Sequence, residues 1–128
     1  SWGYLSDRIG AGKSIFFALT LQGIAILCIG VFPISSGLYL ALSCTIGFGF
    51  GGNFVLFAKE TSFRFGLQNL GAIYPYVFLG YAISGILGPM TGGIFFDIFQ
   101  NFTAATIVAS ILSTAGGLIF MGSLRSKD

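Results

Sequence analysis

Long apolar stretches without a formal charge alternate with short polar segments along the chain. Residues 14–58, 65–96 and 98–124 contain no Asp, Glu, Lys or Arg. A membrane-spanning helix needs about 20 apolar residues, so the first of these stretches is long enough for two helices. Pro33 and Gly37, with two serines between them, mark the break. The pattern therefore predicts an all-α integral membrane protein whose four transmembrane helices cover residues 14–32, 37–58, 71–95 and 103–121.

Polar segments are expected between these helices. Residues 1–13 are predicted to form a loop together with the end of a preceding helix, residues 59–70 a second loop, and residues 122–128 a polar tail. Pro75 is expected in the first turn of its helix, which would place the regular start near Tyr74. We expect a single domain that is a piece of a larger protein.

The third predicted helix carries small residues at every fourth position. They are Gly80, Ser84, Gly88 and Gly92. On a helix this spacing makes one flat stripe, which a second helix can approach closely. Pro89 lies within this stripe and removes a backbone donor, so the helix is expected to bend or weaken there. A close-packed helix with a bend indicates a part that moves.

The second predicted helix has a similar stripe, at Gly37, Ala41, Thr45, Gly49 and Asn53. The glycine-rich residues 47–52 superficially resemble a nucleotide-binding loop. No strand precedes them, and no lysine or acidic partner is nearby, so close helix packing is the better interpretation.

Composition excludes a soluble globular protein. The chain is 55% hydrophobic and 8% charged, with a mean hydropathy of +0.91, whereas soluble domains carry about 25% charged residues. A net charge of +2 gives no indication of a nucleic-acid partner. Because there is no histidine and the two cysteines, Cys28 and Cys44, lie in apolar surroundings, we expect neither a metal site nor a cofactor.

The distribution of charge predicts the orientation in the membrane. Four spans place residues 2–13, 59–70 and 122–128 on one side of the bilayer. All six basic residues lie in these segments: Arg8, Lys13, Lys59, Arg64, Arg125 and Lys127. Asp97 is the only charge in the opposite loops. Positively charged loops favour the cytoplasm, so these segments are predicted to be cytoplasmic, in a plasma or inner membrane.

No catalytic constellation is present, and none of the four acidic residues falls within a predicted span, so we expect no enzyme. Polar and aromatic side chains at the middle of the membrane are the candidates for a substrate path: Thr45, Phe48, Phe50, Tyr81 and Ser84. The alternative is that the hydroxyl groups bond to carbonyls of their own helix while the phenylalanines face lipid.

Two motifs give the chain a resemblance to a known family. Residues 3–10 read Gly-Tyr-Leu-Ser-Asp-Arg-Ile-Gly and are followed by Lys13; residues 85–93 contain Gly-x-x-Gly-Pro-x-x-Gly-Gly. The first resembles the signature cytoplasmic loop of the major facilitator superfamily, and the second resembles its Gly-Pro motif. The resemblance implies a secondary transporter with twelve helices that works by alternating access.

Further residues resemble the C-terminal half of the oxalate/formate antiporter-like family. They are Phe50-Gly-Gly52, Phe65-Gly66, Asn69, Gly71, Tyr74 and Phe78. By this resemblance the four spans are helices nine to twelve, of which the second and third line the path. Phe50 replaces the usual tyrosine, and the third span lacks the lysine of oxalate carriers. A monocarboxylate such as formate or lactate, or a neutral metabolite, therefore fits better than oxalate.

The resemblance also implies a set of gating residues: Gly3, Asp7, Arg8, Gly10, Lys13, Gly85, Gly88, Pro89, Gly92 and Gly93. Asp7 would lie at the positive end of the helix that begins near Gly71. Arg8 would hold the loop through bonds to neighbouring helices or lipid phosphates. Expected partners are a small-molecule substrate, a coupling ion or counter-substrate, the lipid bilayer and the remaining helices of the transporter. The alternatives are a drug or metabolite efflux antiporter, or a non-transporting membrane assembly subunit.

Overall fold

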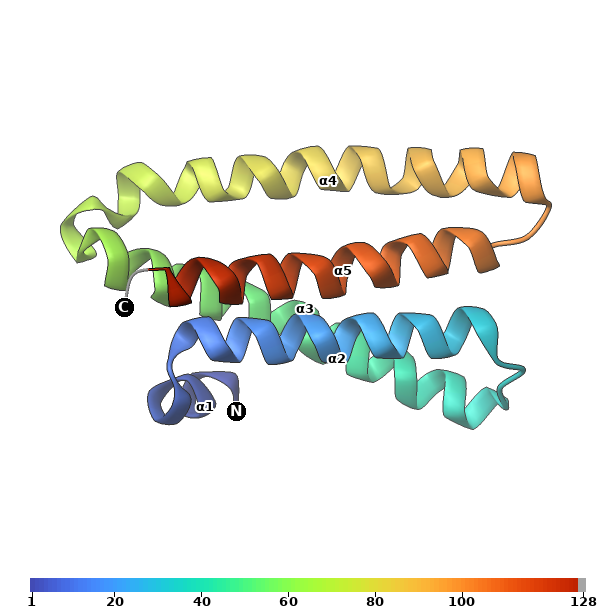
Figure 1. Ribbon diagram of the computed structural model, residues 1–128, viewed down its shortest axis with the longest axis horizontal. Helices are drawn as coiled ribbons and strands as arrows, with labels where there is room; N and C mark the ends of the chain where they lie inside the picture. The colour runs from blue at the N-terminus through green and yellow to red at the C-terminus, as the bar shows by residue number, and fades with distance from the viewer. Residues whose placement is uncertain (127–128) are drawn as a thin grey trace.

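The computed structural model describes residues 1–126, and nearly all of them are helical (Figure 1). The elements in order are α1 (Trp2–Ile9), α2 (Ala11–Val31), α3 (Ser36–Phe65), the 3-10 turn η1 (Leu67–Asn69), α4 (Leu70–Phe99) and α5 (Thr103–Arg125). Four of these helices are long and apolar enough to cross a membrane. The protein is thus a multi-pass integral membrane protein, as the apolar stretches predict.

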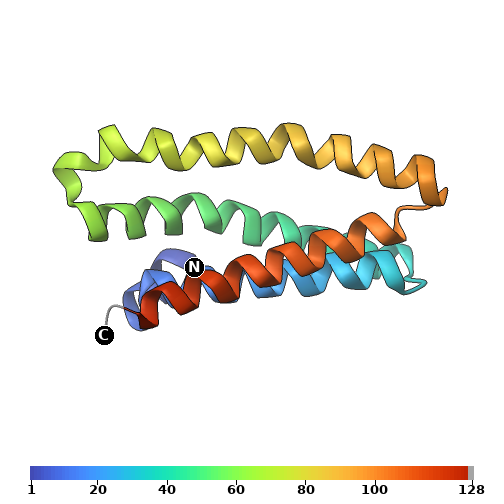
Figure 2. The same ribbon diagram turned by 45° about the horizontal axis from the view of Figure 1, so that its top comes forward.

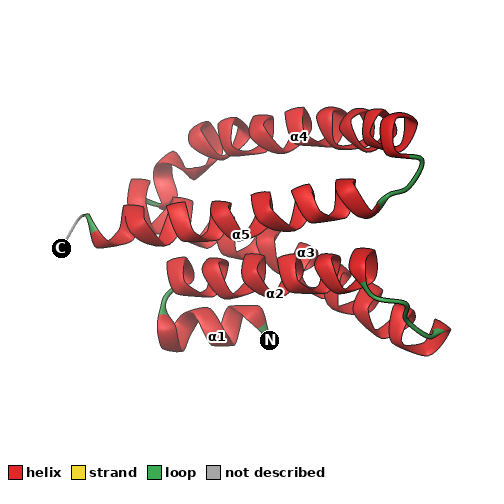
Figure 3. Ribbon diagram, turned by 45° about the vertical axis from the view of Figure 1, so that its right-hand side comes forward, coloured by secondary structure: helices red, strands yellow, loops and turns green. Residues whose placement is uncertain are grey.

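Helix α2 lies at the centre of the packing. Helices α3 and α5 both run along it, whereas α4 has much sparser contacts with α3 and α5 (Figures 1 and 2). The buried core, Ile15, Ala18 and Leu56, joins α2 to α3. No residue of α4 is buried among the described residues, and Figure 3 shows this helix standing apart from the others.

Close helix approach occurs between α2 and α5, where no stripe was predicted. A Cβ atom built on Gly23 would lie 2.7 Å from Thr114 Oγ1 and 3.2 Å from the Ser110 carbonyl oxygen. Ser110 Oγ donates to the Gly23 carbonyl at 2.8 Å, and Ser113 Oγ donates to the Leu19 carbonyl at 2.9 Å. Small residues and serine hydroxyls hold membrane helices together in this way, because apolar burial adds little between helices in lipid.

The predicted stripe on α4 has no such partner. A Cβ atom built on Gly80, Gly88 or Gly92 meets nothing within 4 Å. None of the described helices approaches this stripe, so its close packing against another helix stays a prediction. The stripe on α3 is confirmed in part, since Gly49 is buried against Ala18 and Gln22 of α2, while Gly37 faces open space.

The first polar segment forms the helix α1, so the prediction of a loop at residues 1–13 is wrong. Its apolar residues Trp2, Leu5 and Ile9 recur at helical spacing and are partly buried, so α1 has one face that packs on α2 and α3. The turn to α2 consists of Gly10, with φ 91° and ψ 148°. A side chain strains this conformation, which explains a glycine at this position of the motif.

The helix ends also differ from the prediction. Helix α3 continues to Phe65 because Arg64 Nε donates to Glu60 Oε1 at 2.6 Å, a pairing one turn apart that suits a helix. Helix α4 begins at Leu70, so Pro75 lies inside it rather than in its first turn. Helix α4 also continues through Pro89 to Phe99, and α5 extends to Arg125.

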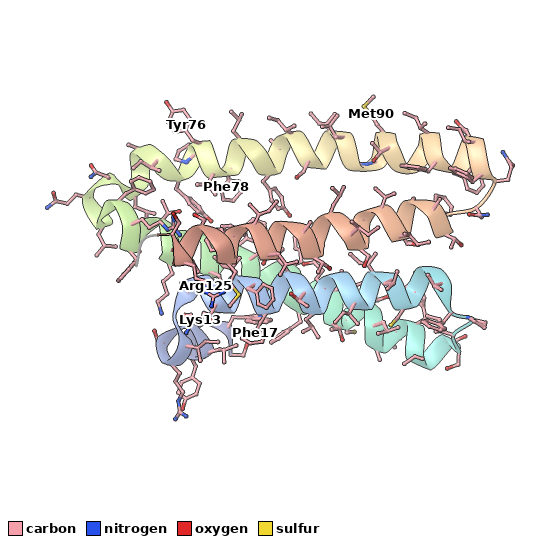
Figure 4. The ribbon with its side chains drawn as sticks, in the orientation of Figure 1. Lys13, Phe17, Tyr76, Phe78, Met90 and Arg125 are labelled. Carbon is pink, nitrogen blue, oxygen red and sulfur yellow. The ribbon has the colours of Figure 1, made fainter. Side chains whose placement is uncertain are left out.

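One end of the molecule contains α1, the turn between α1 and α2, the connection between α3 and α4, and the end of α5 (Figure 1). The described basic residues lie at this end. This end, called the polar end below, carries Arg8, Lys13, Lys59, Arg64 and Arg125. Lys13 and Arg125 are labelled there in Figure 4. Lys127, also predicted on this side, lies outside the described residues. The clustering of charge at one end agrees with the predicted arrangement of spans.

Candidate functional site

A cavity of about 290 Å³ lies between α3 and α4, with one residue of α2 in its wall. Its size is close to the lower end of small-molecule sites, which start near ~300 Å³. None of its lining residues is charged. They are Leu19, Asn53, Phe54, Phe57, Tyr74, Val77, Phe78, Gly80, Tyr81 and Ser84.

Aromatic rings form the wall where α3 faces α4. The Phe54 ring centroid lies 5.6 Å from that of Phe78 and 5.2 Å from that of Tyr81, and Phe50 lies 5.6 Å from Tyr81. Tyr74 meets Phe78 edge-on at 5.0 Å. Figure 4 shows Phe78 pointing from α4 toward the other helices, whereas Tyr76 and Met90 point away. These ring contacts join α3 to α4.

Two hydroxyl groups of α4 are directed to backbone carbonyls. Tyr74 OH donates to the Phe54 carbonyl of α3 at 3.1 Å, which ties the start of α4 to the middle of α3. Ser84 Oγ donates to the Tyr81 carbonyl of its own helix at 2.9 Å. Each hydroxyl keeps lone pairs that can accept a further hydrogen bond.

Asn53 of the cavity wall has an amide oxygen without a hydrogen-bond partner among the described residues. Asn53 Nδ2 donates to Gln22 Oε1 of α2 at 3.4 Å, at the middle of both helices. Asn53 Oδ1 is shielded from solvent and accepts no hydrogen bond from any described residue. Such a group costs free energy unless something pairs with it.

Only some of the predicted path residues lie at this cavity. Tyr81 and Ser84 line the cavity, and Phe50 contacts Tyr81. Phe48 instead lies against Trp2 of α1, with ring centroids 5.3 Å apart. Thr45 Oγ1 donates to the Ala41 carbonyl at 2.9 Å, which is the bond within its own helix that the alternative interpretation predicts. The structure therefore does not bring Thr45 and Phe48 to the cavity.

Sequence reasoning missed several residues of the cavity wall. Asn53 counted only as a member of a stripe, and Phe54, Tyr74 and Phe78 were not candidates. A signal existed in the spacing of aromatic residues. Helical spacing joins residues 50, 54 and 57 of α3, and residues 74, 78 and 81 of α4, into two aromatic stripes that face each other.

The polar end holds the residues of the first motif. Asp7 forms an ion pair with Lys59 of α3, and Lys59 Nζ also donates to Ser6 Oγ at 2.8 Å. The expectation that Asp7 lies at the start of α4 is wrong, because α1 packs on α2 and α3. The reason is that α1 is helical, which turns Asp7 toward the last turns of α3. Arg8 lies over the Tyr4 ring at 4.9 Å and is exposed, as is Lys13.

The glycines of the two motifs have different surroundings. Gly10 makes the turn between α1 and α2, whereas Gly3 lies inside α1 with open space beside it. Gly85, Gly88 and Gly93 also have nothing within 4 Å, and Pro89 lies among them on α4. Gating by these α4 residues stays a prediction, since the described residues include no helix that covers them.

Comparison with known proteins identifies one curated relative. Over 84 residues the chain is 29% identical to the uncharacterized MFS-type transporter YhjX of Escherichia coli K12. This similarity supports the major facilitator superfamily. The alignment covers 66% of this chain and 21% of the relative, so the chain spans about a fifth of that protein. No family model matches the chain, and no solved structure matches it.

Proposed function

We propose that this chain is the C-terminal part of a secondary active transporter of the major facilitator superfamily. The transporter would move a small organic anion, a monocarboxylate such as formate or lactate, by alternating access. The observation that carries the proposal is the uncharged cavity between α3 and α4, two helices that are long enough to span a bilayer. Major facilitator transporters place their substrate near the midplane, between helix groups that rock against each other.

The charge of the cavity wall bears on the substrate. A dianion such as oxalate needs cationic partners at membrane depth, because an unpaired charge there is costly. The cavity wall contributed by this chain has none. A solute with at most one charge and a small body therefore suits the cavity better.

The ion pair between Asp7 of α1 and Lys59 of α3 supports the proposal that α1 and α3 move relative to each other. Lys59 and Asp7 have side chains that are 37% and 69% exposed, so their pairing is worth no more than about 1 kcal/mol. An interaction of this size holds α1 to α3 in one state and breaks readily in another. By the proposed mechanism it would form and break as the two helix groups rock.

Transport assays test the proposal. The full-length protein in proteoliposomes should take up labelled formate and lactate, and oxalate much less, relative to vesicles without protein. Tyr81→Ala should lower uptake up to roughly tenfold, because a ring contact is worth about 0.5–1.5 kcal/mol. Tyr76→Ala is the matched control, since Tyr76 lies on the same helix, is 76% exposed and points away from the cavity (Figure 4). Equal effects of both variants, or no uptake, would contradict the proposal.

An efflux antiporter is the second candidate, and the aromatic cavity wall favours it. Phe54, Phe78 and Tyr81 offer ring faces that suit an apolar compound or a lipophilic cation. Ethidium extrusion from loaded proteoliposomes, without uptake of formate or lactate, would indicate this function.

A further inference from the structure

We infer that Trp2 of α1 is a positioning residue for the aromatic rings that α3 contributes to the cavity, and that it supports them from the far side of α3. The inference rests on the proposed function, because it takes the cavity between α3 and α4 as the substrate site. It names a residue outside the cavity that sets the width of the cavity, and thereby the size of the solute that fits.

The indole of Trp2 lies directly on the backbone of α3. Its Nε1 donates to the Phe48 carbonyl oxygen at 3.0 Å, and the two ring centroids are 5.3 Å apart. A Cβ atom built on Gly52, one turn further along α3, would lie 2.5 Å from Trp2 Cδ1 and 2.6 Å from Trp2 Nε1. Trp2 also packs against the buried core that joins α2 to α3. The ring therefore fits because residue 52 has no side chain, and both helices fix its position.

The indole and the cavity lie on opposite faces of α3. Successive residues of an α-helix are rotated by about 100°, so Phe50 and Phe54 point roughly 200° away from Phe48 and Gly52. The Phe50 and Phe54 rings meet the Tyr81 ring of α4, with centroids 5.6 Å and 5.2 Å apart. A contact that holds α3 at the indole therefore presses these two rings toward α4.

The segment of α3 between the indole and the cavity depends on such support. Residues 47–52 include four glycines, and glycine is the weakest helix former apart from proline, so this segment resists displacement less than the rest of α3. Helix α4 offers little support, because none of its described residues is buried. Helix α2 holds the segment at Gly49, and Trp2 holds it on the face opposite the cavity.

A smaller side chain at residue 2 removes the support behind this segment. Helix α3 can then move away from α4 at the level of Phe50 and Phe54, which widens the cavity. A small solute such as lactate loses contacts in a wider cavity, whereas an acid with a larger body gains room. The expected signature is a change in size selectivity, which a general loss of stability does not produce.

The experiment measures lactate uptake by the full-length protein in proteoliposomes, and its inhibition by mandelate, a monocarboxylate that carries a phenyl ring. Trp2→Ala should raise the half-saturation concentration of lactate up to roughly tenfold, because ring contacts of this kind are worth about that factor. With lactate well below half-saturation, the concentration of mandelate that halves uptake should fall severalfold. Trp2→Phe keeps a ring on Gly52 and should restore most of both values.

Phe17→Ala is the matched control for the loss of a ring. Phe17 is 53% exposed, and its ring meets that of Phe16 on its own helix. This variant should leave both concentrations unchanged. Parallel shifts for lactate and mandelate in Trp2→Ala, a fall in maximal rate alone, or equal effects of Phe17→Ala would overturn the inference.

A second pair of substitutions tests the contact without a transport measurement. Gly52→Ala places a methyl group where the indole lies and should lower the unfolding temperature in detergent by several degrees. In a protein that already carries Trp2→Leu, the same substitution should lower it by less than half as much, because residues in contact are not additive. An equal fall in both backgrounds would overturn the close contact, and the inference with it.

The outcomes separate this inference from the proposed function. Uptake of neither lactate nor formate by the unaltered protein overturns the proposed function. Uptake by the unaltered protein, with unchanged size selectivity in Trp2→Ala, overturns only the role of Trp2.

Discussion

The ion pair between Asp7 and Lys59 shows how single residues place the first motif. Ser6, one residue before Asp7, is buried and accepts a second bond from Lys59 Nζ, so the lysine spans two neighbouring residues of α1. Gly10 then reverses the chain into α2 with a positive φ. The motif therefore acts as a short helix and a turn that dock on the last turns of α3.

Exchanging the charges of this pair tests its role in transport. Asp7→Asn should reduce uptake of lactate severalfold, because α1 loses its charged tie to α3, while stability falls by less than about 1 kcal/mol at these exposed sites. Lys59→Met should have the same effect. The double variant Asp7→Lys with Lys59→Asp should recover part of the uptake.

Uptake and thermal unfolding in detergent are measured on the same preparations. Full uptake by Asp7→Asn would contradict the gating role of Asp7. A large loss of thermal stability would instead assign the pair to folding.

At the scale of helices, two kinds of glycine must be distinguished. Gly23 of α2 touches α5 closely, and its carbonyl receives the Ser110 hydroxyl. Gly88 of α4 has the spacing of a packing stripe but no neighbour among the described residues. Spacing alone shows that a helix can be approached closely, and it does not show by which partner.

Placing leucine at these two glycines separates packing within the chain from packing outside it. Gly23→Leu should destabilise the protein by about 1–3 kcal/mol, since the side chain forces α2 and α5 apart. Gly88→Leu should change the free energy of unfolding by less than about 0.5 kcal/mol, because a side chain at Gly88 meets none of the described residues. We nevertheless expect Gly88→Leu to block transport, because the stripe would face the other helix group when the bundle closes.

Thermal unfolding and lactate uptake of the full-length variants check both expectations. Unchanged uptake by Gly88→Leu would contradict a close contact at the stripe. Unchanged stability of Gly23→Leu would contradict the contact between α2 and α5.

The sequence allowed the helices to be predicted more completely than the site. Four spans follow from apolar length, because a chain in lipid must satisfy its backbone within helices. The end of α3 was missed because Glu60 and Arg64 pair within the helix, so these charges did not end it. Tyr81 and Ser84 were found from their depth in the membrane. Asn53 and Tyr74 were missed because α3 and α4 are apolar around most of their circumference, so hydropathy does not indicate which faces meet.

For the whole molecule, the distribution of charge predicts the orientation in the membrane. The polar end contains the turn after α1, the turn between α3 and α4, and the end of α5 (Figure 1). Among the described residues, Asp97 is the single charged residue at the opposite end. Helix α4 connects the two ends, and its 30 residues give a length of about 45 Å, which exceeds the ~30 Å hydrocarbon core. Its two ends therefore reach water on opposite sides of the membrane.

Single cysteines at the two ends of α4 test the predicted orientation. Gln68 lies in η1 at the polar end, Gln100 follows α4 at the other end, and both are exposed. In a full-length background without other cysteines, including Cys28→Ser and Cys44→Ser, a membrane-impermeant maleimide should label Gln100→Cys in intact cells. It should label Gln68→Cys only after the cells are permeabilised, because basic segments favour the cytoplasm. The reverse labelling would place the polar end outside, and with it the pair of Asp7 and Lys59, so the proposed gate would then act on the external side.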